Sequence, residues 1–220
     1  MLLPVLDLLN SKKIVLASAS VARKSMLETA GLKFTVSPST FEENLPHSEF
    51  ATSTDYVVKT SEMKLLDKLQ ELSLKGEGVD LIIVADTIIS IEDREIIEKP
   101  RDKEHAFEIL RKLSDCGSHQ VLTSVWIAFV EEHVGEDGER KLVLSRKENV
   151  LDRTTVHFQS LDDETIKAYV ESGEPFGKAG GYGIQGKAST FISRIEGCYY
   201  SVWGFPLSAF CKKLREMLVA

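Results

Sequence analysis

The part of the sequence best suited to chemistry is a glycine-rich stretch that carries a lysine, a tyrosine and a glutamine. It reads "EPFGKAGGYGIQG" and runs from Glu174 to Gly186. A turn needs one or two glycines to reach positive φ, so this stretch has more than a turn requires. We therefore expect a ligand or another backbone to approach it closely, with amides freed at Gly180, Gly181 and Gly183.

Two side chains in this stretch suit the two ends of a charged heterocyclic ligand. Lys178 is a compact cation that can meet a phosphate. The amide of Gln185 can pair with the adjacent N–H and carbonyl of a uracil or thymine ring, or, rotated, with adenine. Gln185 by itself therefore leaves the base open.

A second candidate for phosphate binding is "LASASVAR", which spans residues 16–23. It reads as a strand, a serine-rich turn and a helix start, where free backbone N–H groups and the helix dipole favour an anion. Ser18 and Ser20 add hydroxyls, and Arg23 adds a planar fork that suits phosphate oxygens. The alternative is an ordinary capped helix with a solvated arginine.

Asp86 lies inside the apolar run "VDLIIVADTII". A buried carboxylate needs a metal, a cation or hydrogen bonds to compensate its desolvation. A strand that ends near Ala85 would place Asp86 at the carboxyl edge of a sheet, where ligands bind in open α/β folds. The alternative is an aspartate that caps a turn between two strands.

Other polar residues carry no local signal of chemistry. Lys64, Lys99, Glu42 and Glu43 resemble surface residues when each is taken alone. The five histidines have no metal-ligand spacing and no serine or cysteine partner, so we expect them to be structural or exposed: His47, His105, His119, His133 and His157.

Alternating strands and helices are expected to position these residues. Strands are predicted over 12–18, 33–38, 79–91, about 119–131 and 140–158. Helices are predicted over 21–30 between Ser20 and Gly31, from Thr54 or Asp55 to Leu74, from Asp102, from a capping box of Ser160 and Asp163, and from Pro206. The segment between the two long β segments is expected to be an exposed hairpin loop. The pattern predicts one α/β domain over residues 1–220, with two lobes that flank a cleft.

Composition narrows the classes of partner. The net charge of −7 argues against nucleic acid polymers, which require a basic footprint. No apolar run is long enough to span a membrane, and the apolar residues 1–11 read as an amphipathic lead-in rather than a signal peptide. Three cysteines without CxxC spacing predict neither disulfides nor zinc and fit a cytoplasmic location.

Five motifs together resemble those of the Maf family of nucleoside triphosphate pyrophosphatases. They are "LASAS…R", "ADTII…EKP", "GSHQVLTSV", "EPFGKAGGYGIQG" and "VWGFPL", in that order over about residues 12–215. The resemblance implies an elongated mixed-sheet fold like that of inosine triphosphate pyrophosphatases, with a deep cleft between lobes. It also implies hydrolysis of dTTP or UTP to the monophosphate and pyrophosphate, Mg²⁺ or Mn²⁺ as cofactor, a house-cleaning role and a homodimer.

The resemblance also implies roles for individual residues. Asp86 matches the proposed general base and Glu43 a metal or water partner, which makes these two the expected metal ligands. The positions that match triphosphate-binding cations are Arg23, Lys64, Lys99 and Lys178. Thr87 and Gln185 match positions of the branch that prefers dTTP and UTP.

Three departures from the family pattern predict altered specificity. Ala22 replaces the first arginine of the usual Ser-Pro-Arg-Arg, Gly177 replaces an aspartate, and Ser201 replaces a common asparagine. Losing one charge-assisted contact costs about 1.5–3 kcal/mol of binding. Two alternatives therefore stand beside the main hypothesis: a nucleotide-binding regulator of cell division with little turnover, and a pyrophosphatase redirected to purine or methylated nucleotides.

Overall fold

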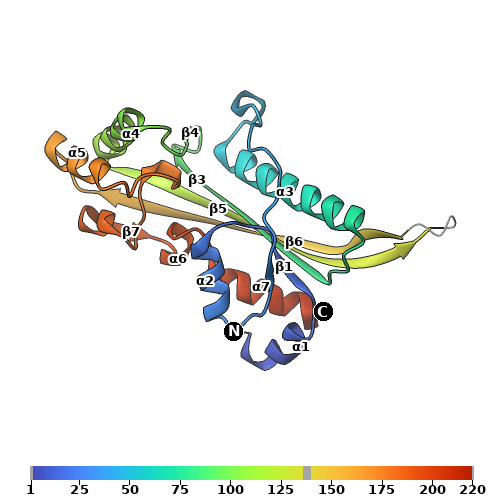
Figure 1. The fold of residues 1–220 in the computed structure, drawn as a ribbon. Coiled ribbons are helices and arrows are strands. Elements are labelled where there is room, and N and C mark those ends of the chain that lie inside the picture. Colours follow the sequence, from blue (N-terminus) through green and yellow to red (C-terminus); the bar gives the residue numbers. More distant parts are fainter. Residues whose placement is uncertain (1, 136–139, 220) are drawn as a thin grey trace.

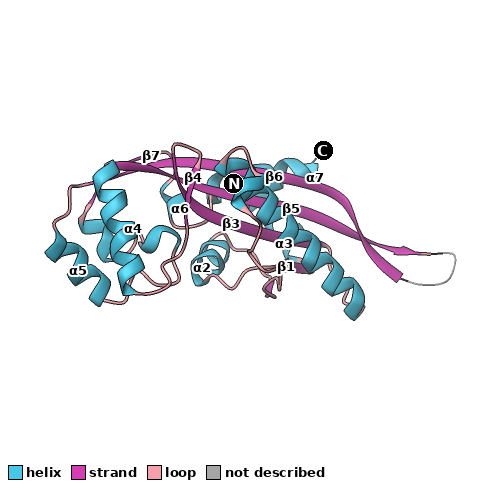
Figure 2. Cartoon of the chain, turned by 90° about the horizontal axis from the view of Figure 1, so that it is seen from above, coloured by secondary structure: helices cyan, strands magenta, loops and turns pink. Residues whose placement is uncertain are grey.

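The computed structural model describes residues 2–135 and 140–219 and confirms the α/β class. Seven strands of these residues form one mixed, strongly twisted sheet that gives the molecule its elongated shape (Figures 1 and 2). The strands are β1 (Ile14–Leu16), β2 (Thr35–Val36), β3 (Leu81–Ile91), β4 (Glu95–Ile97), β5 (Ser118–Val134), β6 (Arg140–Phe158) and β7 (Ile192–Glu196). Their order is β2-β1-β3-β5-β6-β7, with β4 paired to β3.

Helices lie on both faces of this sheet (Figures 1 and 2). They are α1 (Leu6–Asn10), α2 (Val21–Thr29), α3 (Ser53–Lys75), α4 (Lys103–Cys116), α5 (Asp163–Glu171), α6 (Tyr199–Val202) and α7 (Leu207–Val219). Of these, α4 and α5 lie at the end away from the β5–β6 hairpin (Figures 1 and 2). Strand alternation places successive β3 side chains on opposite faces. Ile82 and Val84 therefore pack with Leu65 of α3, whereas Ile83 packs in a separate cluster with Phe210 of α7.

Side-chain caps fix where most helices begin. The hydroxyl of Ser20 accepts from the Arg23 amide and starts α2 as predicted, and Asp102 starts α4 in the same way. The predicted capping box at Ser160 is wrong, because the N-cap of α5 is Asp162, whose carboxylate accepts from the Thr165 amide. A carboxylate two residues further on is the better acceptor for that first turn.

Other predicted boundaries shift because tertiary pairing, not the apolar run, sets strand length. β1 and β2 are shorter than the predicted 12–18 and 33–38, since only Ile14–Leu16 and Thr35–Val36 find partners. The long helix α3 begins at Ser53, after the N-cap Thr52, and ends at Lys75. Its C-cap is Gly76, which adopts φ 64°. The last helix begins at Leu207, one residue after Pro206.

The two long β segments pair as predicted, over Ser118–Val134 and Arg140–Phe158. The predicted hairpin loop between them lies in part at 136–139, outside the described residues. The lead-in is a 3₁₀ turn and α1, and its Leu2 and Leu9 are buried in the core shared with α7. Among the described helices, none combines the length and apolarity that crossing a bilayer demands.

The sheet leaves a short stretch of β3 uncovered on one edge. β1 pairs in parallel with Leu81–Ile83 and then ends, and β4 begins to pair only at Ile89. The intervening residues of β3, 84–88, are paired on their other side by β5. This gap, at the carboxyl end of β1, is where side chains of β3 can meet a ligand.

Candidate active site

A cavity of about 430 Å³ opens at this gap and is large enough for a small-molecule ligand. It gathers segments far apart in sequence: the start of α2, the loop before α3, the middle of β3 and the glycine-rich stretch. Nine of the ten site residues expected from the sequence line it: Ser20, Arg23, Glu43, Lys64, Asp86, Thr87, Lys99, Lys178 and Gln185. The tenth, Ser18, lies behind Arg23 and accepts a hydrogen bond from its guanidinium at 3.0 Å.

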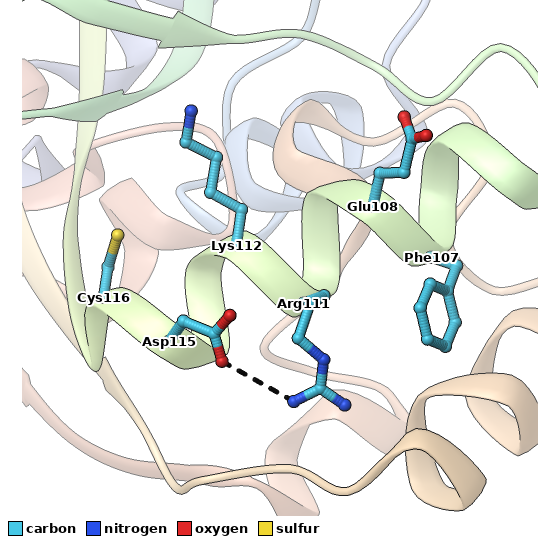
Figure 3. A pocket seen from close by; sticks show the side chains of 6 residues that line it. All are labelled: Phe107, Glu108, Arg111, Lys112, Asp115 and Cys116. Carbon is cyan, nitrogen blue, oxygen red and sulfur yellow. Dashed lines mark ion pairs between the residues drawn. The ribbon is translucent and has the colours of Figure 1, made fainter.

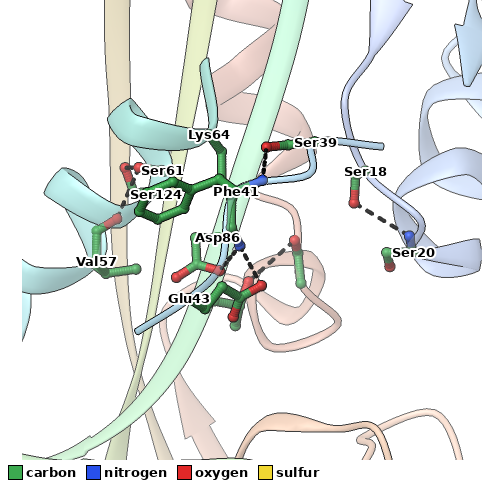
Figure 4. A network of polar contacts seen from close by, with 12 residues as sticks. Ser18, Ser20, Ser39, Phe41, Glu43, Val57, Ser61, Lys64, Asp86 and Ser124 are labelled. Atoms are coloured by element: carbon green, nitrogen blue, oxygen red, sulfur yellow. Dashed lines mark hydrogen bonds and ion pairs between the residues drawn. The ribbon is translucent and has the colours of Figure 1, made fainter. Parts of the chain in front are cut away.

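Lys64 lines the cavity and lies between two carboxylates (Figure 4). Its ammonium donates to Oδ1 of Asp86 and to Oε1 of Glu43, each at 2.7 Å. The side chains of Lys64 and Asp86 are 9% and 8% exposed, so this pair is shielded from water. The Nζ atom of Lys99, at the rim of the cavity, lies 3.6 Å from the other carboxylate oxygen of Glu43, Oε2.

Asp86 does not lie at the end of its strand, nor does it cap a turn. β3 continues through Asp86 to Ile91, because β5 pairs with Leu81–Ser90 and β4 pairs with Ile89–Ile91. Asp86 reaches a ligand instead because its neighbour β1 ends at Leu16. Consecutive residues of a strand point to opposite faces, so Asp86 meets Lys64 of α3 while Thr87 meets Arg23 of α2.

The carboxyl of Glu43 is held ionised by its neighbours. Burial raises its pKa, but the ammonium of Lys64, with smaller contributions from Lys99 and Arg23, more than offsets this and leaves the pKa below its ordinary value. Glu43 lies on a loop without regular structure. Asp67 anchors this loop by accepting from the backbone amides of Thr40 and Phe41.

Arg23 is fixed by three acceptors from three separate parts of the chain. Its guanidinium donates to Ser18 Oγ, Thr87 Oγ1 and the carbonyl of Gly204, each at 3.0 Å. Burial lowers the pKa of Arg23, and the carboxylates of Asp86 and Glu43 oppose that shift. The hydroxyl of Thr87 is thus engaged by the protein, although Thr87 also lines the cavity.

The glycines of the stretch from Glu174 to Gly186 mainly permit packing of protein on protein. A Cβ at Gly180 would lie 2.5 Å from the side chain of Ile89, and one at Gly186 would lie 2.2 Å from Oε1 of Glu174. A Cβ at Gly183 would lie 3.0 Å from Lys178 and 3.3 Å from Gln185, the two polar side chains of the stretch. Close approach is found, but it is made by side chains of the chain itself, whereas a ligand or another backbone was expected.

Glu174 is a residue that the sequence did not single out. Its carboxylate accepts from the backbone amides of Lys187 and Ala188 and from the hydroxyl of Tyr169, and its carbonyl accepts from Lys178 Nζ. These contacts close the glycine-rich stretch into a loop. In the sequence, Glu174 is only an acid at the start of the glycine-rich stretch. An acid in that place resembles an ordinary surface residue, so the sequence gives little sign of its role.

Two further residues of the cavity belong to the "VWGFPL" motif, but neither is predicted to have a role from the sequence. The carbonyl of Gly204 holds Arg23, and Trp203 lines the same cavity. Both follow α6, and neither belongs to a pattern of polar side chains. His119 is structural as expected: it is buried and hydrogen-bonded through Nε2 to the hydroxyl of Tyr182 at 2.7 Å.

The three departures from the family pattern lie in or near the cavity. Ala22 and Gly177 line it, and Gly177 adopts φ +77°, with open space where a Cβ would lie. Ser201 is fully buried, and its Oγ finds no partner within the described part of the chain. The first two remove polar groups from the cavity wall.

The cavity offers a hard cation a small number of carboxylate ligands. Within residues 2–135 and 140–219, no cluster of three or more histidine, cysteine or acidic side chains is arranged to hold a metal. Glu43 and Asp86 supply two carboxylates, and Mg²⁺ is commonly held by one or two carboxylates together with phosphate oxygens. A metal here would share those carboxylates with Lys64.

A separate hollow lies on the outer face of α4 (Figure 3). Its cations are engaged within the protein: Arg111 pairs with Asp115 and Asp163, and Lys112 pairs with Glu95. It shares no residue with the cavity at β3. The cavity at β3, which nine of the ten expected site residues line, is therefore the candidate active site.

Comparison with known proteins identifies the family of the chain. The family model described as "Maf-like protein" matches residues 13–217. The chain is 39% identical over 211 residues to a dTTP/UTP pyrophosphatase of Ruminiclostridium cellulolyticum, covering 94% of this chain and 99% of that protein. It is 37% identical over 209 residues to a dTTP/UTP pyrophosphatase of Bacillus cereus, covering 94% of this chain and 91% of that protein.

A longer relative and a solved structure complete the comparison. The chain is 39% identical over 217 residues to a "Probable bifunctional dTTP/UTP pyrophosphatase/methyltransferase protein" of Homo sapiens, covering 98% of this chain but spanning only 34% of that protein. A nucleoside-triphosphatase / dITP/XTP pyrophosphatase of Mycobacterium abscessus is 12% identical and covers 68% of this chain and 75% of its own, with a TM-score of 0.39 that is too low to support a statement about the fold. The family match spans nearly the whole chain, and this chain belongs to the family of Maf-like proteins.

Proposed function

We propose that the chain is a nucleoside triphosphate pyrophosphatase that converts dTTP, UTP or a modified pyrimidine nucleotide to the monophosphate and pyrophosphate. The observation that carries this proposal is the buried Asp86–Lys64 pair, which the more exposed Glu43 joins, inside a cavity also lined by Arg23 and Lys178. The names of the bacterial relatives, dTTP/UTP pyrophosphatase, support the reaction and its substrates.

The charges of the cavity match a triphosphate. Four cations surround it: Arg23, Lys64, Lys99 and Lys178. They would bind the phosphate oxygens and stabilise the charge that develops on the leaving pyrophosphate. Positioning and electrostatics of this kind supply most of the catalysis in phosphoryl-type transfer.

Asp86 is the proposed general base. One of its oxygens is engaged by Lys64, and the carboxylate lies at the wall of the cavity. It would take a proton from a water molecule whose oxygen forms the new bond to the α-phosphorus. The bond between that phosphorus and the bridging oxygen then breaks, and pyrophosphate leaves with the bonding electrons.

Glu43 and Asp86 would hold a divalent cation, Mg²⁺ or Mn²⁺, together with oxygens of the substrate. Such an ion, when bound, would neutralise phosphate charge and lower the pKa of a coordinated water. The residues of the chain orient the substrate whether or not that ion contributes to each step. Gln185 would read the base, and the loss of an arginine at Ala22 would weaken or shift the preference for dTTP and UTP.

A nucleotide panel tests this function. Purified protein is incubated with dTTP, UTP, purine triphosphates and methylated nucleotides, with Mg²⁺ or Mn²⁺, and pyrophosphate is measured. Release of pyrophosphate with dTTP or UTP supports the proposal, and in ¹⁸O-labelled water the label should enter the monophosphate. Thermal stabilisation by nucleotide without pyrophosphate release would instead identify a nucleotide-binding protein, and a higher kcat/KM for a purine would identify a redirected enzyme.

A homodimeric state and a cytoplasmic location stay predictions from the family resemblance and the cysteine content. Size-exclusion chromatography with light scattering measures the first directly.

A further inference from the structure

A second, smaller cavity lies directly beside the candidate active site. Its volume is about 160 Å³, against about 430 Å³ for the large cavity. The two cavities share five lining residues, which include the proposed general base: Glu43, Asp86, Thr87, Lys99 and Ala179. Asp86 therefore lines both cavities.

The size and walls of the smaller cavity exclude a nucleotide. Sites for small organic ligands occupy roughly 300–1,000 Å³, about twice its volume or more. Its remaining walls are Tyr56 of α3, Ile88 of β3, Ile96 and Ile97 of β4, and Glu98. Space of this size still holds several water molecules, each of which takes roughly 30 Å³ in the liquid.

The charges of the smaller cavity exclude a phosphate group as well. Glu43, Asp86 and Glu98 contribute three carboxylates, and Lys99 is the cation among its lining residues. A triphosphate or a departing pyrophosphate would therefore remain on the side of the large cavity, where the cations gather. Water, in contrast, finds hydrogen-bond partners in these carboxylates.

Tyr56 adds a donor to this set. It is 5% exposed, and edge-on contacts with the rings of His47 and Phe50 hold its ring. Burial raises the pKa of its phenol, with Asp86 and Glu98 acting in the same direction, so the hydroxyl keeps its proton at neutral pH. A water molecule in this cavity would have donors and acceptors on more than one side.

From this arrangement we infer that the smaller cavity is the chamber that supplies the attacking water to Asp86 while a nucleotide fills the large one. The inference rests on the proposed function. In a displacement at phosphorus, the attacking and leaving oxygens lie on opposite sides, so water and pyrophosphate need separate routes. The water passes its proton to Asp86 as its oxygen bonds to phosphorus and the bond to the bridging oxygen breaks.

Substitutions at Ile96 test the chamber without altering a charged residue. Ile96 is half-buried and lines only the smaller cavity. In Ile96→Phe we expect kcat for dTTP to fall about tenfold with KM and melting temperature near wild type, because the larger ring occupies space that water needs. Ile91→Phe is the matched control: Ile91 is half-buried in the same β3–β4 hairpin and lines neither cavity.

A second variant enlarges the chamber and changes the product. With methanol present, a methanol molecule in the place of water would give the methyl ester of the nucleoside monophosphate and pyrophosphate. In Ile96→Ala we expect the methyl ester to form a several-fold larger share of the product than in wild type. This measurement keeps the inference falsifiable if Ile96→Phe fails to fold.

The outcomes separate the inference from the function on which it rests. Absence of pyrophosphate release by the wild type refutes the proposed function. If the wild type is active, an unchanged kcat in Ile96→Phe together with an unchanged product share in Ile96→Ala overturns the chamber. A raised KM at unchanged kcat in Ile96→Phe also overturns it, because the cavity would then hold part of the nucleotide.

Discussion

Lys64 Nζ lies 2.7 Å from Oδ1 of Asp86, and both side chains are almost fully withdrawn from water. The contact joins the middle of α3 to the middle of β3 at the point where the edge of the sheet is open. A buried ion pair is costly to break, since removing one partner leaves an uncompensated charge. This pair therefore stabilises the packing of α3 on β3 and is also the candidate reaction centre.

Replacing Lys64 tests this pair. Lys64→Ala should lower kcat/KM at least a hundredfold and lower the free energy of unfolding by about 3 kcal/mol, because it leaves Asp86 buried without its cation. Lys59→Ala on the same helix is the control, since Lys59 pairs with Glu62 at an exposed position and should change stability by less than about 0.5 kcal/mol. Urea unfolding and steady-state kinetics measure both effects. Equal stability of the two variants would contradict the account.

Thr87 is expected to act by holding Arg23. Thr87→Val keeps the shape of the side chain and removes the oxygen that accepts from the guanidinium. We expect KM for dTTP to rise about tenfold with kcat little changed, the effect of one lost hydrogen bond to a charged group. Thr87→Ser retains the oxygen and should restore most of the affinity. A Thr87→Val enzyme with wild-type KM would show that Arg23 needs no such support.

The glycine-rich loop can be opened at one position. Gly186→Ala would place a Cβ 2.2 Å from Oε1 of Glu174 and displace the carboxylate that closes the loop, so melting temperature and affinity should both fall. Gly78→Ala is the matched control, because its Cβ meets only Lys13 Nζ at 3.6 Å and its φ is not positive. Gly78→Ala should be neutral or slightly stabilising. Thermal melting and KM for dTTP are the measurements, and equal effects at the two positions would refute the assignment.

The buried His119 predicts a slope of stability with pH. Burial, and to a lesser degree His157, lowers the pKa of His119 to about 3, whereas an unfolded histidine titrates near 6.5. Between these values the unfolded chain binds the proton and the folded chain does not. Stability should therefore be constant above about pH 6.5 and fall below it, by at most about 1.4 kcal/mol per pH unit.

The variant His119→Gln isolates the contribution of His119 to this slope, because an amide can still form a hydrogen bond with the hydroxyl of Tyr182. Urea unfolding at about pH 8, 6 and 5 should show a smaller acid loss in the variant than in the wild type. Parallel curves for the two proteins would show that His119 does not cause the slope.

The sequence predicts that the carboxylate of Asp86 needs a compensating group but does not say which residue supplies it. A carboxylate within an apolar run indicates compensation by a metal, a cation or hydrogen bonds, and in the structure Lys64 is a cation that provides it. The predicted strand over 79–91 is confirmed, but the possibility that it ends near Ala85 is wrong, because β5 pairs with Leu81–Ser90 on both sides of Asp86. The end of β1 depends on pairing between segments that are distant in sequence. The local pattern of apolar and polar residues carries no information about that pairing.

The glycine-rich stretch shows the same limit in another form. Its excess of glycine predicts approach by a ligand or another backbone, whereas the groups found closest to Gly180 and Gly186 are the side chains of Ile89 and Glu174. Likewise Arg23 and Thr87 were expected to bind ligand separately, and they bind each other. Side-chain partners across 64 positions of sequence depend on the fold and could not be read from either motif.

The measurement that tests the account most directly is pyrophosphate release by Asp86→Asn. The amide keeps the size of the side chain and cannot take a proton from water, and Lys64 keeps Glu43 as its partner. We predict that release from dTTP falls at least a thousandfold while the melting temperature stays near wild type. An Asp86→Asn protein that releases pyrophosphate at the wild-type rate would contradict the role of Asp86 as general base.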